Sequence, residues 1–170
     1  EGPPFAPPRP SFNASRADEA CPPVVYAGNL DAYQNVLFLK RVMDRVRKQA
    51  PDARLILATR GHVAFDGAEI VHTPDFAALR EVLQQDAVVV CPRVSWSGYP
   101  IKLLNAMAAG KAIVACRSAA HPIENERTGL IVDDNDEKAF ASAVARLLRD
   151  PELRSRLGAA AHQAVDARHS

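Results

Sequence analysis

Short apolar runs alternate with amphipathic segments along most of this 170-residue chain. Residues 23–28 (PVVYAG), 54–59 (RLILAT) and 87–91 (AVVVC) form runs with the length and continuous hydrophobicity of strands buried on both faces. Shorter runs with the same character lie at 69–72, 112–115 and 130–132. The pattern therefore predicts about six strands.

The segments between these runs have the period of helices. Residues 34–50 place apolar side chains on one face and Lys or Arg on the other, and Pro51 ends the pattern. Further helices are expected where a polar residue suited to N-capping precedes an amphipathic stretch. The capping candidates are Asp75, Asn135 or Asp136, and Asp150 followed by Pro151.

Strands that alternate with helices are typical of a parallel sheet built from βαβ units. We therefore predict an α/β fold with a Rossmann-like, doubly wound parallel sheet of about six strands flanked by helices, over residues 23–170. Residues 1–22 are different, because seven of the 13 prolines lie in the first 23 residues without any apolar period. We interpret this stretch as a Pro-rich linker and expect another segment of the protein to precede it.

Composition narrows the possible functions. Lys and Arg total 21 against 20 for Asp and Glu, so the net charge gives no pull toward nucleic acid or an anionic membrane. No apolar stretch is long enough to span a membrane, and a cytoplasmic location is expected. The three cysteines are expected to be reduced, buried residues, and the chain shows no cluster of metal ligands.

The segment after the run at 87–91 carries the most chemical information. It consists of a loop of small residues, a helical stretch and Gly110 as a left-handed stop. Ser97 is suited to cap the helix and Pro100 to its first turn, so that free amide groups there would attract an anion such as a diphosphate. Gly98 leaves the approach open, and Lys102 is the candidate counter-charge. A solvent-facing lysine on an ordinary helix is the competing interpretation.

The run SGYPIKLLNAMAAGKAIVA resembles the signature segment of GT-B type retaining glycosyltransferases, the glycosyl transferases group 1 family. VVYAGNLDAYQN resembles the opening strand and glycine loop of these enzymes, and RTGLIVDDND resembles their late strand and acidic turn. AVARLLRDPELRSRLGAAAHQA is similar to their closing helix pair. The resemblance covers roughly residues 23–166 and matches the C-terminal, donor-binding half of the GT-B fold.

The resemblance implies a donor site and also shows how this chain departs from the family pattern. Two glutamates of the family fall on Ser97, beside the donor sugar, and on Asn105, beside the nucleotide ribose. An Arg and a Lys that contact the donor phosphates fall on Asn29 and Gln34. All four positions are neutral here, so Lys102 or Arg93 would have to supply the charge.

The other donor-binding candidates act through backbone or shape. They are Gly28 in the first glycine loop, Gly61 near the expected nucleotide base, and Gly98, Tyr99, Pro100 and Ile101 around the start of the signature helix. Ser97 is the only catalytic candidate, by its position alone.

The resemblance implies transfer of a sugar from a nucleotide-diphosphate donor to an acceptor in glycan biosynthesis, with retention, without a metal and without a cofactor. It implies as partners the nucleotide sugar and an upstream Rossmann-like half, through which peripheral membrane contact is conceivable. The isolated half is expected to be inactive alone. Two alternatives stay open: a non-catalytic nucleotide-binding or interaction module that has lost the donor residues, and an unrelated doubly wound domain.

Overall fold

The protein is described from a computed structural model, which covers residues 21–28, 33–61, 65–93 and 101–169. The strands are β1 (Val24–Ala27), β2 (Leu55–Thr59), β3 (Glu69–His72), β4 (Val88–Cys91), β5 (Ala112–Cys116) and β6 (Leu130–Val132). The helices are α2 (Tyr33–Gln49), α3 (Phe76–Val82), α4 (Ile101–Ala108), α5 (Glu137–Arg149) and α6 (Pro151–His169), with a short 3-10 turn at Arg117–Ala119. Each predicted strand is therefore present within one or two residues of its expected bounds, and each predicted helix is present, although the expected start of α4 at Ser97 lies outside the described residues.

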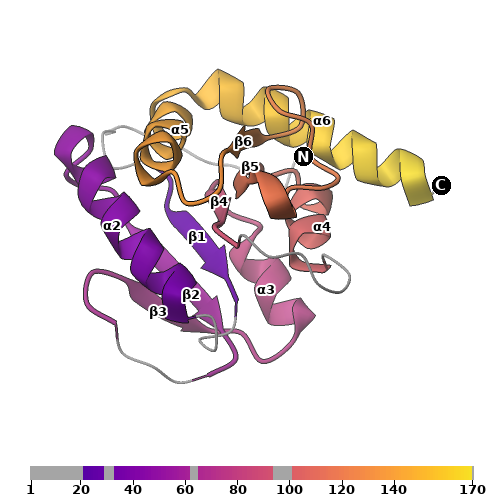
Figure 1. Cartoon of the computed structure of the whole chain (residues 1–170). Coiled ribbons are helices and arrows are strands. Elements are labelled where there is room, and N and C mark those ends of the chain that lie inside the picture. Colours follow the sequence, from indigo (N-terminus) through magenta and orange to yellow (C-terminus); the bar gives the residue numbers. More distant parts are fainter. Residues whose placement is uncertain (1–20, 29–32, 62–64, 94–100, 170) are drawn as a thin grey trace, which may run out of the picture.

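The six strands form one parallel sheet in the order β3-β2-β1-β4-β5-β6 (Figure 1). Val25 of β1 pairs with Ile56 of β2 on one side and with Val89 of β4 on the other. The chain first builds the sheet outward from β1 to β3 and then returns to start again at β4. The predicted Rossmann-like, doubly wound sheet is confirmed, and its switch point lies between β1 and β4.

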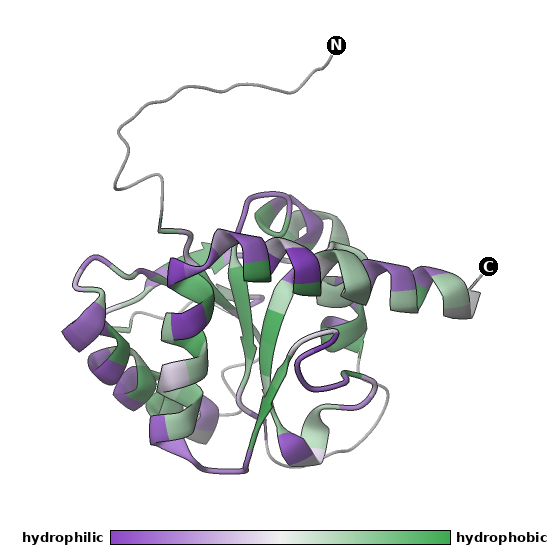
Figure 2. Ribbon diagram, turned by 90° about the horizontal axis from the view of Figure 1, so that it is seen from above, coloured by the Kyte–Doolittle hydropathy of each residue, from purple (hydrophilic) through white to green (hydrophobic). Residues whose placement is uncertain are grey.

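Helices cover both faces of the sheet. One core contains the buried sides of α2 and α5, packed on alternate residues of the strands such as Val24, Leu57 and Val114. The other contains α3, α4 and part of α6, packed on the intervening residues such as Val89 and Ile113. Figure 2 shows the strands as a hydrophobic layer between helices that are polar on their outer sides.

The helices begin where the sequence provides caps. The carboxylates of Asp75, Asp136 and Asp150 accept hydrogen bonds from the amides of Ala78, Ala139 and Leu153, at 2.9, 3.0 and 3.0 Å. Asp136 is thus the cap of α5, while Asn135 takes a positive φ of 62° in the turn before it. Phe140 of α5 then packs edge-on against Phe38 of α2, with ring centroids 5.4 Å apart.

Close backbone contact joins α6 to the end of α4. Gly110 ends the α4 segment with φ of +72°, as predicted from the sequence. The carbonyl of Gly110 lies so close to Gly158 of α6 that a Cβ there would be only 2.1 Å from its oxygen. His162, one turn further along α6, contacts the Ala108 carbonyl through Nδ1 at 2.8 Å.

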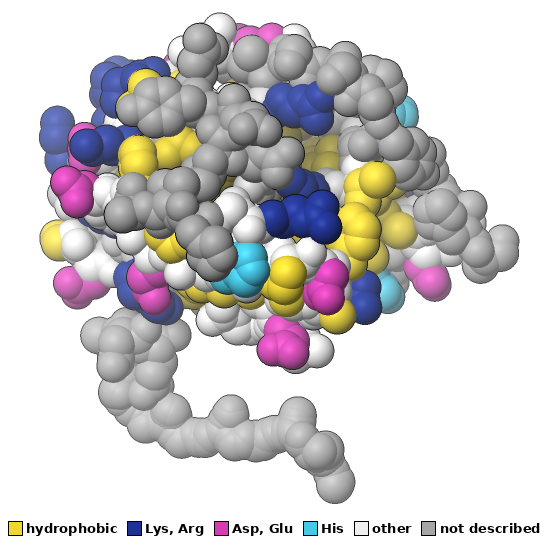
Figure 3. Space-filling view, turned by 90° about the horizontal axis from the view of Figure 1, so that it is seen from below, with side chains coloured by type: hydrophobic (Ala, Val, Ile, Leu, Met, Phe, Trp, Pro, Cys, Tyr) yellow, Lys and Arg dark blue, Asp and Glu magenta, His cyan; other side chains and the backbone are white. Residues whose placement is uncertain are grey.

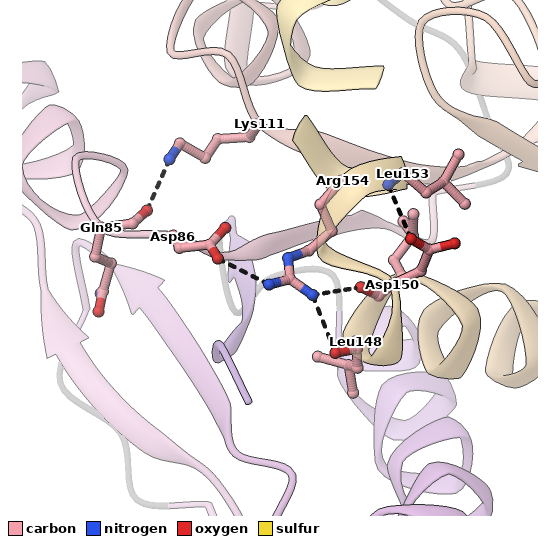
Figure 4. A network of polar contacts seen from close by, with 8 residues as sticks. Gln85, Asp86, Lys111, Leu148, Asp150, Leu153 and Arg154 are labelled. Atoms are coloured by element: carbon pink, nitrogen blue, oxygen red, sulfur yellow. Dashed lines mark hydrogen bonds and ion pairs between the residues drawn. The ribbon is translucent and has the colours of Figure 1, made fainter. Parts of the chain in front are cut away.

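A buried arginine connects the helices to the opposite, amino-terminal edge of the sheet (Figure 4). The Arg154 side chain is 7% exposed and donates to the carbonyls of Leu147 and Leu148 at the end of α5. It also donates to the Asp86 carboxylate, before β4, at 2.9 Å. At the same edge, Lys111 donates through Nζ to the Gln85 carbonyl at 2.7 Å.

The three cysteines are unpaired, as expected. Burial raises the pKa of Cys91 to about 12 and that of Cys116 to about 11, so both thiols are unreactive at neutral pH. Within the described ranges, no helix combines the length and hydrophobicity needed to cross a bilayer. Residues 1–20, most of the predicted linker, lie outside the described part of the chain.

Candidate functional site: a basic pocket at the carboxyl edge of the sheet

A pocket of about 250 Å³ opens where parallel strands β1 and β2 end. Its lining comes from the ends of these strands, from the connection between β3 and α3, and from the first turn of α4. The lining residues are Ala27, Gly28, Ala58, Thr59, Arg60, Thr73, Asp75, Phe76, Leu79 and Lys102. Ligands of doubly wound folds bind at this edge beside the switch point, so the pocket lies where the fold itself favours a site.

Gly28 forms the wall of the pocket beyond β1. Its amide donates to the Ala58 carbonyl at 3.1 Å, which extends the pairing with β2 by one residue. A Cβ on Gly28 would lie 2.6 Å from both Cζ and Oη of Tyr26. The Tyr26 ring therefore fills the space that a side chain would need, and a glycine is required here for steric reasons.

Lys102 and Arg60 line the pocket, and Arg93 lies near enough to Lys102 for its charge to act on that lysine. Lys102 lies in the first turn of α4, Arg60 follows β2 and Arg93 follows β4. Desolvation, with the nearby charges of Arg60 and Arg93, lowers the pKa of Lys102 below its ordinary value. Repulsion among three cations raises the energy of the unliganded site, so an anion bound between them would relieve it.

Arg60 is positioned by the β3–α3 connection. Its Nε donates to the Pro74 carbonyl at 3.2 Å. The Thr73 amide donates to the Thr59 carbonyl at 2.8 Å, and the Gly61 amide donates to the Thr59 hydroxyl at 3.1 Å. These bonds hold the loop after β2 against the loop after β3 at the pocket wall.

Sequence reasoning missed the β3–α3 connection as part of the site. Phe76 is 49% exposed although it is a large hydrophobic residue, and its neighbour Asp75 caps α3. The sequence contained one signal: Phe76 directly follows the helix cap Asp75, at a position where the apolar period of the helix does not call for a hydrophobic residue. Its place beside the pocket depends on β3 being the neighbour of β2, which the sequence pattern does not specify.

The structure brings some of the predicted site residues together. Gly28 and Lys102 line the pocket, and Gly61 follows the lining residue Arg60. Ile101 lies next to Lys102 with 46% of its surface exposed. Asn105 is half-buried, one helical turn further along α4, and does not line the pocket.

The remaining predicted site residues cannot be placed. Asn29, Ser97, Gly98, Tyr99 and Pro100 lie outside the described residues, and Gln34 lies in the first turn of α2 with its side chain undescribed. Among the described residues, no group of three or more His, Cys, Asp and Glu is arranged to hold a metal ion.

The carboxyl edge of the sheet has a mixed basic and apolar surface in space-filling view (Figure 3). Lys and Arg side chains gather near the middle of this face, next to hydrophobic ones. Such a surface fits a ligand with an anionic part and an apolar or planar part.

Comparisons with known proteins agree with this picture. Residues 21–150 match the family model described as "Glycosyl transferases group 1". A mannosyltransferase from Mycolicibacterium smegmatis, named as GDP-mannose-dependent alpha-(1-6)-phosphatidylinositol monomannoside mannosyltransferase, is 28% identical over 85% of this chain and 44% of its own length. The chain thus spans less than half of that relative.

Solved structures share the fold. The C-terminal domain of the group 1 family protein LpcC from Francisella tularensis superposes with a TM-score of 0.71, at 16% identity and over 90% of both chains. Anabaena HepE, solved in complex with UDP-glucose, has a TM-score of 0.69 at 12% identity, over 86% of this chain and 44% of its own. With the family model matching most of its length, the chain belongs to the glycosyl transferases group 1 family, and its fold is that of the C-terminal domain of these GT-B enzymes.

Proposed function

We propose that this chain is the donor-binding half of a glycosyltransferase that uses a nucleoside diphosphate sugar. The observation that carries the proposal is that Lys102 and Arg60 line one pocket at the switch point of the sheet, with the charge of Arg93 close to Lys102. Family membership provides the reaction class. A diphosphate would pair with these positive side chains, and a sugar-transfer enzyme needs such a group held firmly as it leaves.

In this proposal the diphosphate lies beside Lys102 at the start of α4. The first amides of a helix have no acceptor within it, and the helix dipole places partial positive charge there. When the bond from the anomeric carbon to the phosphate oxygen breaks, negative charge grows on that phosphate. The cations and the helix amides are already in place to stabilise it, and they replace the Arg and Lys that the family pattern would put at Asn29 and Gln34.

We extend the proposal to the rest of the reaction. The acceptor hydroxyl forms the new bond to the anomeric carbon and loses its proton, with retention of configuration as the family resemblance implies. The charge that a metal would supply comes from the side chains described above. The acceptor would be bound by an upstream Rossmann-like half, which is in keeping with the chain's spanning 44% of its first curated relative.

The β3–α3 connection is the proposed subsite for the base. The exposed ring of Phe76 offers a flat apolar surface, and the Asp75 carboxylate lines the same pocket while one of its oxygens caps α3. Guanine presents a ring N–H and an exocyclic amino group on one edge, which suit a carboxylate acceptor. The relatives named as GDP-mannose-dependent support guanosine over uridine as the nucleoside.

Titration of GDP and UDP into the 170-residue chain, followed by calorimetry, tests the proposal. We expect millimolar or tighter binding, with GDP preferred. Lys102→Met should weaken the binding of GDP by about tenfold or more, since charge-assisted hydrogen bonds contribute about 1.5–3 kcal/mol. Lys111→Met is the matched control, because Lys111 is also a partly buried lysine with a lowered pKa but lies at the opposite edge of the sheet.

The pH dependence of binding gives a second readout for Lys102. Its pKa is lowered in the free chain, and a bound anion would raise it, so binding favours the protonated form. GDP affinity should therefore be level near neutral pH and fall at alkaline pH, beginning below the ordinary lysine pKa. Lys102→Arg should remove that fall. If neither nucleotide binds, or Lys102→Met binds as the parent does, the non-catalytic module becomes the better interpretation.

A further inference from the structure

The near-neutral net charge hides a concentration of positive charge on two helices. Helices α2 and α5 together carry eight Lys and Arg against two carboxylates, a net charge of +6. Because the whole chain has a net charge of +1, the rest of it sums to −5. The cations are Lys40, Arg41, Arg45, Arg47, Lys48, Lys138, Arg146 and Arg149, and the carboxylates are Asp44 and Glu137.

These two helices lie side by side on one face of the sheet (Figure 1). Arg41 and Arg45 each donate through Nε to the same carboxylate, that of Glu137, at 2.8 Å. At the other end of the seam, Arg149 donates to the Gln49 side chain at 3.0 Å. Arg146 is paired with the Glu126 carboxylate at 2.8 and 3.0 Å, but Glu137 is shared by two guanidinium groups, so the seam keeps a surplus of positive charge.

The basic side chains are exposed along both helices, except for Arg47, which donates to the Ala53 and Gly67 carbonyls. Arg41, Arg45 and Lys48 follow one another at spacings of four and three residues, which places them on one face of α2. Arg41 and Arg45 have 55% and 46% of their side chains exposed. On α5, Lys138 and Arg149 are exposed and three helical turns apart. The result is a continuous basic surface, which we call the α2–α5 face.

This face has the charge for binding a polyanion but lacks the features that read nucleic acid. The exposed large hydrophobic residues of the described chain are Phe76, which lines the pocket, and Ile101, next to Lys102, and neither belongs to α2 or α5. Single-stranded nucleic acid is bound by exposed aromatic side chains that stack on bases. Cations spread over two neighbouring helices instead match a broad layer of anionic headgroups, to which juxtamembrane basic segments are attracted without insertion.

We propose that the α2–α5 face docks on a membrane surface that contains anionic lipid. The inference goes beyond the proposed donor site and does not depend on it. No described residue of α2 or α5 lines the pocket, so docking through this face would leave the pocket uncovered. Attraction is electrostatic, and no helix has to enter the lipid.

Co-sedimentation with vesicles tests this inference. The 170-residue chain should bind phosphatidylcholine vesicles that contain phosphatidylserine, should not bind vesicles of phosphatidylcholine alone, and should be released by salt because screening weakens the attraction. Equal binding to both kinds of vesicle, or to neither, would overturn the proposal.

A matched pair of charge reversals distinguishes binding through the α2–α5 face from binding that depends only on the net charge of the protein. Lys48→Glu in α2 and Arg80→Glu in α3 each change the net charge by two units, and each residue lies in the last turn of its helix. Lys48→Glu should weaken vesicle binding by about tenfold or more, at roughly fivefold per basic charge, while Arg80→Glu should leave it nearly unchanged. The double variant Lys48→Glu/Lys138→Glu lowers the charge of the two helices from +6 to +2 and should abolish binding.

Two controls complete the design. GDP affinity and thermal unfolding of Lys48→Glu should match the parent, because the side chain is exposed and far from the pocket. Equal losses in the Lys48 and Arg80 variants would show that only net charge acts. Displacement of the chain from the vesicles by an equal phosphate concentration of duplex DNA would favour nucleic acid as the partner. Equal losses in the two variants, or displacement by DNA, would each contradict the proposal.

Discussion

Tyr26 and Gly28 form a contact that decides what the turn after β1 can contain. The ring is buried, desolvation raises the pKa of its hydroxyl, and the hydroxyl shares a hydrogen bond with Asn35 in the first turns of α2. A tyrosine in the strand thus connects the glycine of the pocket wall to the helix that follows. Neighbouring positions at the pocket wall are in this way fixed by packing as well as by hydrogen bonds.

Gly28→Ala should destabilise the fold by about 1–3 kcal/mol, because its Cβ would meet the Tyr26 ring at 2.6 Å. The same substitution should cost little in a Tyr26→Val background, where the ring is gone. It should remain costly in Tyr26→Phe, which keeps the ring and loses only the hydroxyl. Urea unfolding of the four combinations measures the coupling, and equal costs of Gly28→Ala in the Tyr and Val backgrounds would contradict the steric explanation.

At the scale of elements, α4 depends on α6 for its position. The start of α4 carries Lys102, and its end is clamped by Gly158 and His162 of α6. Gly158 is the point of closest approach, because it lets the Gly110 turn lie directly against the helix backbone. The long closing helix therefore supports the pocket without touching it.

Gly158→Ala tests this contact, because the contact decides whether the substitution raises or lowers the free energy of unfolding. Alanine in place of glycine ordinarily stabilises a helix by about 1 kcal/mol. Here the new Cβ would lie 2.1 Å from the Gly110 oxygen, so we expect a loss of about 2–4 kcal/mol and weaker GDP binding as α4 shifts. Ser155→Ala, at an exposed position of the same helix, is the control and should be neutral or stabilising. If the Gly158→Ala protein were more stable than the parent, α6 and the Gly110 turn could move apart without loss of stability.

At the scale of the whole molecule, Arg154 ties both helical layers to the sheet at the edge opposite the pocket (Figure 4). It closes the end of α5, begins α6 and reaches Asp86 in front of β4. Its Nε has no hydrogen-bond partner among the residues that the structure describes, so this buried guanidinium depends on its other bonds to offset the cost of leaving water.

Removing Asp86 should therefore be costly only while Arg154 is present. Asp86→Asn takes a charged partner from a buried guanidinium, and we expect a loss of about 1–3 kcal/mol in thermal or urea unfolding. Arg154→Met should cost about 2–4 kcal/mol, since two carbonyls at the end of α5 lose their donor. In the double variant the losses should be clearly less than additive. Additive losses would mean that the Asp86 contact contributes nothing of its own.

Much of the fold could be predicted because it depends on local patterns. Continuous apolar runs specify buried strands, and the amphipathic stretches between them specify covering helices with caps at Asp75, Asp136 and Asp150. Gly110 was predicted as a left-handed stop from its place after a helical run, and its φ of +72° agrees. Lys102 could be chosen because a cation at the start of a helix after a buried strand has few structural reasons to be there.

What only the tertiary structure decided is which loops meet. Arg60, Asp75, Phe76 and Lys102 come from three separate connections, and they share one pocket because β3, β2, β1 and β4 are successive neighbours in the sheet. The basic α2–α5 face likewise exists because two helices nearly a hundred residues apart pack side by side on one face. Hydrophobic periodicity determines which side of each segment is buried. Strand order depends instead on which pairings among all the segments give the most stable sheet. A site or surface assembled from several segments is therefore fixed only once that order is known.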